Sequence, residues 1–178
     1  MAFQNIGTMT PYGAPVKLFR IVSNSITITI NDSVKQASGF IALGTTGALV
    51  FGHVQGIGTE KGMPMNTTGV AGADIGTFIN AFATSSTNQT VAKVKAECDV
   101  SKFTLYSASL DNTIGTTTGS NLPGYNMDIT DQTQLSESSS AANTSAATTA
   151  GQYTTHGVDP VNSARAVVSI YESQVFGI

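Results

Sequence analysis

The chain has 178 residues, of which 40% are hydrophobic and only 11% are charged, and its formal net charge is −3. Its one cysteine, Cys98, excludes an intramolecular disulfide and a cysteine-based zinc cluster, and no apolar run reaches the ~18 residues of a membrane span. From Phe103 onwards the only basic residue is Arg165, so we expect no binding to nucleic acid.

The N-terminal segment, residues 1–15, mixes Gly, Pro, Thr and Gln with scattered apolar residues and has no sustained period. Pro11 and Pro15 disfavour a helix here, so we expect an extended arm. The C-terminal "VFGI" also carries apolar groups, and we expect it to pack on its own sheet or on a partner. Because these segments lack a core of their own, we predict partner contacts through Phe3, Ile6, Met9, Tyr12, Val175, Phe176 and Ile178.

After the arm, several short apolar runs predict β-strands. The first two are "VKLFRI" (16–21) and "SITITI" (25–30), and in the second Ile26, Ile28 and Ile30 alternate with polar residues. "NDS" supplies a turn, and "GFIAL" (39–43) and "ALVFGHVQGI" (48–57) follow. Within the last run, Gly52 and Gly56 indicate a bulge or a close approach of backbones.

The glycine-rich stretch "GALVFGHVQGIGTEKGMPM" (47–65) raises the question of a phosphate-binding loop. Such a loop needs a strand, a glycine turn and then a helix, but here Pro64 interrupts and Lys61 is followed by Gly62 and Met63. We therefore interpret the stretch as a strand followed by a β-hairpin turn.

The middle of the chain offers one short helix and one clear strand. Ile75, Phe78, Ile79 and Phe82 are spaced for one helical face within 70–85. In "VAKVKAECDV" (91–100), apolar residues alternate with charged ones, which predicts a half-buried strand with Asp99 on its polar face. "KFTLYSA" (102–108) should be its return strand or a bent extension.

The last third begins with turn residues at 108–123 and a short strand, "GYNMDIT" (124–130). The Ser/Thr/Ala-rich segment at about 136–152 has side chains too small for a core, so we expect an exposed loop, or a loop ordered against a neighbouring subunit. "QYTTHGVDP" is interpreted as a turn. Alternation of Ala166, Val168 and Ile170 predicts a final strand.

Candidate reactive residues are few. His53 and His156 lie far apart in the sequence, and a structural role is the more common one for a lone histidine. Cys98 falls on the apolar side of its strand. Asp128 and Asp131 lack the ligand spacing of a calcium loop, and no G-x-S-x-G nucleophile motif occurs. We expect no catalytic site, metal or cofactor, and hence a binding or structural protein rather than an enzyme.

Two regions resemble a known family. The segment "SITITINDSVKQASGFIALGTTGALVFGHVQGIGTEKGMPM" and the end "HGVDPVNSARAVVSIYESQVFGI" are similar to head decoration, or cement, proteins of tailed bacteriophages. This resemblance implies a structural virion protein that binds the exterior of the capsid and stabilises the lattice of the major capsid protein. It also implies a homo-oligomer, with a trimer favoured, made in the host cytoplasm.

The sequence thus predicts a mainly β fold, a compact antiparallel barrel or sandwich with an N-terminal arm and at most one short helix. Residues 16–178 are expected to form a single β-rich domain. Two alternatives remain: a tail-tube or head–tail connector protein, and a carbohydrate-binding module on the virion surface, for which the lack of Trp is unfavourable.

Overall fold

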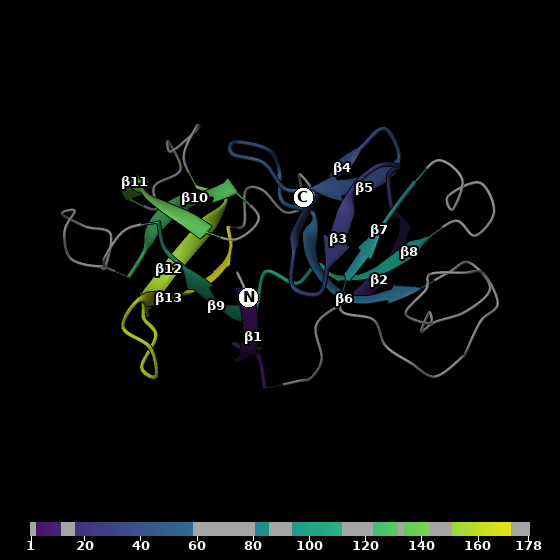
Figure 1. Ribbon diagram of the computed structural model, residues 1–178. Coiled ribbons are helices and arrows are strands. Elements are labelled where there is room, and N and C mark those ends of the chain that lie inside the picture. The colour runs from purple at the N-terminus through teal and green to yellow at the C-terminus, as the bar shows by residue number, and fades with distance from the viewer. Residues whose placement is uncertain are drawn as a thin grey trace.

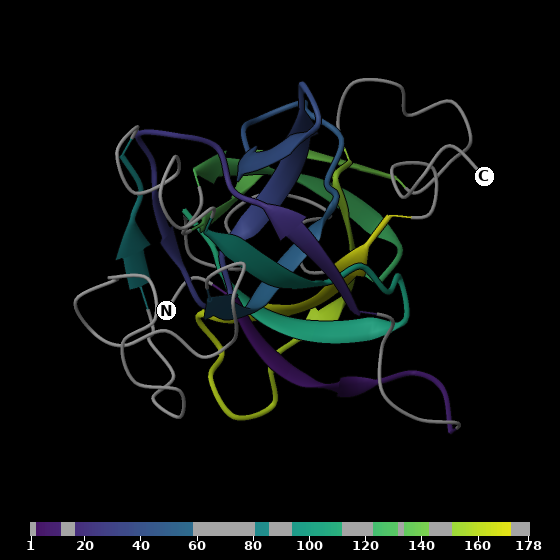
Figure 2. The same ribbon diagram turned by 90° about the vertical axis from the view of Figure 1, so that its right-hand side faces the viewer.

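The computed structural model describes residues 3–11, 17–58, 81–85, 94–111, 123–131, 134–142 and 151–171. In these ranges the chain forms strands and turns and no helix, which confirms the mainly β fold. The strands build two antiparallel sheets that pack together as a sandwich, one on the left and one on the right of Figure 1. Figure 2 looks along the direction in which one sheet covers the other.

The six-stranded sheet consists, from edge to edge, of β1 (Phe3–Thr8), β9 (Thr104–Ser109), β13 (Arg165–Ile170), β12 (Tyr153–Val158), β10 (Tyr125–Asp131) and β11 (Gln134–Ala142). Its core-facing side chains form one buried cluster, which includes Phe3, Tyr106, Met127, Ile129, Leu135 and Tyr153. Ala166, Val168 and Ile170 of β13 are all buried there, as their alternation predicted.

The five-stranded sheet has the order β2 (Lys17–Ile21), β8 (Lys95–Asp99), β6 (Gly52–Gly58), β4 (Ser33–Ala37) and β5 (Phe40–Leu43). A two-stranded sheet, β3 (Thr27–Thr29) with β7 (Ala81–Ala83), accompanies it. The second buried cluster includes Ile28, Val34, Ile41, Val54, Ile57 and Cys98. Ile26 and Ile30 pack against this cluster, so the predicted isoleucine face is confirmed.

Both glycine predictions in β6 are confirmed. A Cβ atom on Gly52 would lie 2.3 Å from the backbone oxygen of Asp99, so only glycine allows these two strands to approach so closely. The pairing of β6 with β8 shifts register between Val54 and Gly56, which is a β-bulge. The hairpin turn expected after β6 lies outside the described residues.

Two of the connections between the sheets are the chain itself, from β8 to β9, and the side chain of Gln152. β8 ends at Asp99 and β9 begins at Thr104 in the other sheet, so "KFTLYSA" is a bent extension and not a return strand. Gln152 forms the second connection. Its side-chain oxygen accepts the N–H of Ile129 at 2.9 Å, and its Nε2 donates to the carbonyl of Thr45 at 3.0 Å.

Several expectations differ from the structure. Residues 3–8 of the expected arm do not lie free, because β1 pairs with β9 of the same chain and Phe3 is fully buried. Residues 134–142, expected to be an exposed loop from about 136, form β11 on β10, since backbone pairing needs no large side chains. "QYTTHGVDP" contains β12 and is not only a turn. Of the segment expected to hold the helix, residues 81–83 form the strand β7, and residues 70–80 lie outside the described ranges.

Candidate functional site

Three polar side chains form a row across the middle of the five-stranded sheet. Ser33 of β4, His53 of β6 and Asp99 of β8 are register partners on adjacent strands, so their side chains point to the same face. That face is covered by the six-stranded sheet, and all three residues are fully buried. A row of this kind must be hydrogen-bonded to be stable, and the opposite sheet supplies the partners.

Two tyrosines of the opposite sheet complete this row. The hydroxyl of Tyr106 donates to Oδ2 of Asp99 at 2.9 Å, and the hydroxyl of Tyr153 lies 3.0 Å from Nε2 of His53 and 2.7 Å from Oγ of Ser33. The ring of His53 also stacks on Tyr106, with centroids 4.0 Å apart. We call these five residues the inter-sheet lock.

The direction of the protons in the lock follows from its acceptors. Nδ1 of His53 lies 3.2 Å from the carbonyl oxygen of Asn31, which can only accept, so Nδ1 carries the proton of the neutral ring. Nε2 then accepts from Tyr153, whose hydroxyl also lies within hydrogen-bond distance of Oγ of Ser33. Burial lowers the pKa of His53 to about 4 and raises the pKa of Tyr153, which keeps both groups neutral near pH 7.

The lock contains Ser, His and Asp but does not have the geometry of a hydrolase triad. His53 faces a backbone carbonyl at Nδ1 instead of Asp99, and a tyrosine hydroxyl stands between His53 and Ser33. All three groups are closed to solvent in this structure. The chemistry that this arrangement supports is therefore a polar attachment of one sheet to the other.

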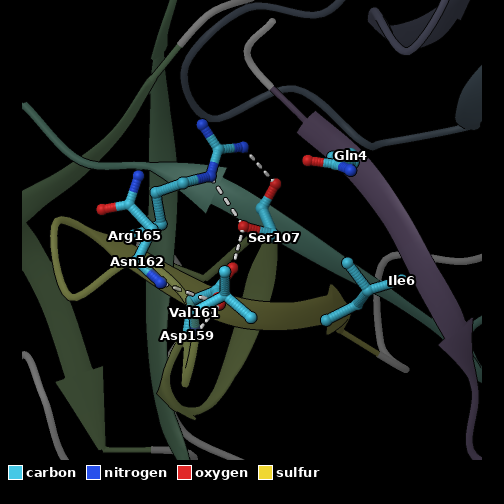
Figure 3. Close-up of a pocket in the computed structure, with 7 residues that line it drawn as sticks. All are labelled: Gln4, Ile6, Ser107, Asp159, Val161, Asn162 and Arg165. Atoms are coloured by element: carbon cyan, nitrogen blue, oxygen red, sulfur yellow. Dashed lines mark hydrogen bonds between the residues drawn. The ribbon is translucent and has the colours of Figure 1, made fainter.

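An accessible site lies on the outer face of the six-stranded sheet. Figure 3 shows this pocket, which has a volume of about 520 Å³ and lies between β1 and the turn that joins β12 to β13. Its lining residues are Gln4, Ile6, Ser107, Asp159, Val161, Asn162 and Arg165. We call it the β1 pocket. These residues come from three separate parts of the sequence, and the sheet order β1–β9–β13 brings them together.

The floor of the β1 pocket is a charge pair joined through a serine. Arg165 donates from Nε to Oγ of Ser107 at 2.7 Å, and from Nη2 to the backbone oxygen of Ser107 at 2.6 Å. Ser107 in turn donates to Oδ2 of Asp159. This hydrogen bond from Ser107, together with the N–H of Val161, holds the pKa of Asp159 below its ordinary value. The two charges thus compensate each other within the pocket.

The sides of the β1 pocket are apolar. Ile6 is 45% exposed and Val161 is 94% exposed, and the two side chains extend toward each other in Figure 3. Ile6 occupies the bulge of β1, where register shifts between Asn5 and Gly7, and a bulge of this kind redirects a side chain. Exposed aliphatic groups at a pocket entrance favour contact with another molecule over contact with water.

The structure places the residues that were predicted to contact a partner in different environments. Ile6 lines the β1 pocket, and Met9 is exposed nearby, where its N–H donates to the backbone oxygen of Phe103 at 2.8 Å. Phe3 packs against His53 and Tyr153 in the core and is not available to a partner. Tyr12, Val175, Phe176 and Ile178 lie outside the described residues.

The remaining candidate residues are engaged within the protein. Cys98 is buried, and burial raises the pKa of its thiol to about 12. Oδ1 of Asp128 accepts the N–H groups of Gly151 and Gln152 at 3.0 and 3.2 Å. Nε2 of His156 lies 2.9 Å from Oγ of Ser169. In the part of the chain that the structure describes, no three His, Cys, Asp or Glu side chains gather in a way that could hold a metal ion.

Comparison of the chain with protein families, with curated proteins and with solved structures found no match. Within the described ranges there is also no helix long and apolar enough to cross a membrane. The pocket and the exposed surface around it are therefore the features of the structure that bear on function.

Proposed function

We propose that this protein is a structural component of a tailed-bacteriophage virion that binds the exterior of the capsid and stabilises the lattice of the major capsid protein. The observation that carries the proposal is a group of exposed apolar side chains along β1: Ile6, Met9, Phe103 and Val161. We call them the β1 surface. Apolar groups gathered beside a sheet edge are typical of a surface that another protein covers.

The position of β1 supports this proposal. Among the described strands β1 is at one edge of the six-stranded sheet, and its sequence, FQNIGT, contains no charged residue. Charged side chains are a common protection of edge strands against pairing with other chains, and β1 has none. An uncharged edge is suited to contact with a partner protein, including addition of a partner strand.

The closed core behind the β1 surface also supports the proposed function. A capsid stabiliser has to transmit force between the subunits it connects, so a closed core with a polar attachment between its sheets is favourable. The inter-sheet lock joins both halves through hydrogen bonds at 2.7 to 3.0 Å. Buried networks of this kind specify one packing arrangement of the surrounding core.

Binding to capsids tests the proposal directly. Purified protein is mixed with capsids that lack it, the particles are separated on a density gradient, and their thermal stability is measured. We expect the protein to sediment with the capsids and to raise the temperature at which they open. Protein that remains at the top of the gradient would overturn the proposed function.

We further propose that the protein acts as a homotrimer, which the resemblance to decoration proteins favours. A closed ring of three copies would present three β1 surfaces to the lattice and gain affinity through multivalent binding. Native mass spectrometry should then give a species of about 55 kDa, three times the chain mass of 18.3 kDa. A species at the mass of one chain, at every concentration tested, would contradict the trimer.

A further inference from the structure

The turn that forms one side of the β1 pocket, Asp159–Ala164, is held in one shape by its own hydrogen bonds. Oδ1 of Asp159 accepts the N–H groups of Val161 and Asn162 at 2.8 and 3.3 Å. The backbone bonds from Asp159 to Arg165 and from Arg165 to Asn162, each 2.9 Å, close the turn. The turn therefore holds Val161 in one position. Binding of a partner would then cost less conformational entropy, because the turn is already ordered.

The charged groups at the floor of the pocket are hydrogen-bonded within the protein. Asp159 and Arg165 are charged, but Ser107 connects them, and Arg165 also donates to Oγ of Ser109 at 2.7 Å. A group that enters the pocket would exclude water without leaving either charge uncompensated. An apolar group above this floor would therefore not bury an unpaired charge, which costs more than burial of charges that are connected by hydrogen bonds.

The entrance combines two kinds of side chain. Ile6 and Val161 provide aliphatic walls, and two amide side chains also line the pocket, Gln4 from β1 and Asn162 from the turn on the other side (Figure 3). Amide side chains can both donate to and accept from the backbone of an extended peptide. Aliphatic walls suit an aliphatic side chain, whereas sites for sugar rings commonly offer an aromatic face, and the described lining contains no aromatic residue.

We propose that the β1 pocket receives an extended, uncharged segment of the major capsid protein, with one branched aliphatic side chain of that segment between Ile6 and Val161 and its peptide backbone bonded to Gln4 and Asn162. This proposal rests on the proposed function for the identity of the partner, but the chemistry of the pocket can be tested without a capsid.

The first experiment is an NMR titration of the isotope-labelled full chain. The probes are two blocked pentapeptides, acetyl-GSLSG-amide and acetyl-GSSSG-amide, and free N-acetylglucosamine. We expect the leucine peptide to shift the signals of Gln4, Ile6, Val161 and Asn162, and the serine peptide to leave them unchanged. Equal shifts with both peptides, no shift with either, or shifts with the sugar alone would overturn the proposal.

The second experiment measures capsid binding of two matched variants. Val161→Ser removes the exposed aliphatic wall, and Leu49→Ser removes an exposed leucine, 65% accessible, that does not line the pocket. We expect Val161→Ser to weaken binding by about tenfold, because the variant loses the favourable free energy of burying one valine side chain. We expect Leu49→Ser to bind like the unaltered protein. Equal binding of the two variants would overturn the docking role of the pocket.

These results separate the two proposals. If the unaltered protein does not bind capsids, the proposed function and the capsid as the partner are both overturned, while the peptide titration still decides what the pocket accepts. If the unaltered protein binds but Val161→Ser has no effect, the proposed function stands and the pocket is not the docking site.

Discussion

The hydroxyl of Tyr153 lies 3.0 Å from Nε2 of His53, and this contact joins the two sheets at the centre of the molecule. Both residues are fully buried, and the same hydroxyl lies 2.7 Å from Oγ of Ser33. A single phenol of the six-stranded sheet thus contacts two polar side chains of the five-stranded sheet, His53 and Ser33. This position makes Tyr153 the residue on which the attachment between the sheets most depends.

Replacement of Tyr153 by phenylalanine should destabilise the fold while preserving its shape. Phenylalanine keeps the ring but leaves His53 without a donor at Nε2 and Ser33 without the phenol oxygen. An unsatisfied buried polar group costs about 1–3 kcal/mol, so we expect a loss of about that size in the free energy of unfolding, measured with urea. A variant as stable as the unaltered protein would show that the contact does not hold the sheets together.

The buried His53 should make the protein less stable in acid. Its pKa is lowered to about 4 because the charged ring would lose its hydration between the sheets, whereas the ordinary value is 6.5. The unfolded state therefore takes up the proton first. The contribution of neutral His53 is complete above about pH 6.5 and is lost progressively as pH falls toward about 4, by about 3 kcal/mol in total.

The direct measurement is an NMR titration of the imidazole nitrogens. We expect the ring of His53 to remain neutral, with its proton on Nδ1, down to about pH 5. A transition near the ordinary value of 6.5 would contradict the burial of this residue between the sheets.

Asp32 should have the opposite dependence on pH. Burial raises the pKa of its carboxyl to about 6, although the N–H of Thr29 donates to Oδ2 at 2.8 Å. The charged carboxylate is thus disfavoured in the folded state, so its contribution to stability is lost as pH rises from about 4 to about 6. The stability of Asp32→Asn relative to the unaltered protein should increase from pH 4 to pH 7. A difference that is constant over this range would contradict the raised pKa.

The close approach of β6 and β8 predicts a severe effect of a single methyl group. In Gly52→Ala the new Cβ would lie 2.3 Å from the backbone oxygen of Asp99, and a strand backbone cannot yield as a flexible side chain can. We expect a loss of about 3 kcal/mol or more in the free energy of unfolding. Gly39→Ala is the comparison, because no atom lies within 4 Å of its Cβ and only its positive φ of 82° opposes the change, at about 1–2 kcal/mol. Equal losses would contradict the close contact.

The thiol of Cys98 should be unreactive in the folded protein. Burial raises its pKa to about 12, so almost no thiolate is present at pH 8, and the side chain is not exposed. We expect a disulfide reagent such as DTNB to modify the native protein slowly and the urea-unfolded protein at the rate of a free cysteine. Rapid modification of the native protein would show that the five-stranded sheet opens easily.

Hydrophobic alternation predicted those parts of the fold in which one face of a strand meets a core. It placed the buried faces of 25–30, of β8 and of β13 correctly because the period of two marks which side chains point inward. It was wrong for Asp99, which alternation assigns to the polar face. That face is covered by the second sheet, and a single strand contains no signal for what lies on its other side.

The segments that sequence reasoning missed lack a hydrophobic signal. β11 is rich in Ser and Ala, with Leu135 buried near its start, so composition alone favoured a loop. At the candidate site, Ile6 was predicted from its apolar character, but Ser107 and Asp159 are 52 residues apart and meet only through the sheet order. The one sequence signal for this site is Arg165, which is the only cation after Lys102 in a segment that also contains several acidic residues.

The measurement that tests the central claim most directly is the copy number of this protein relative to the major capsid protein, by quantitative mass spectrometry of gradient-purified virions. A decoration protein should be present at a ratio near one, or at a simple fraction that reflects occupancy of the symmetry axes of the lattice. A handful of copies per particle would assign the protein to the tail or the connector, and its absence from the particle would contradict a structural role in the virion.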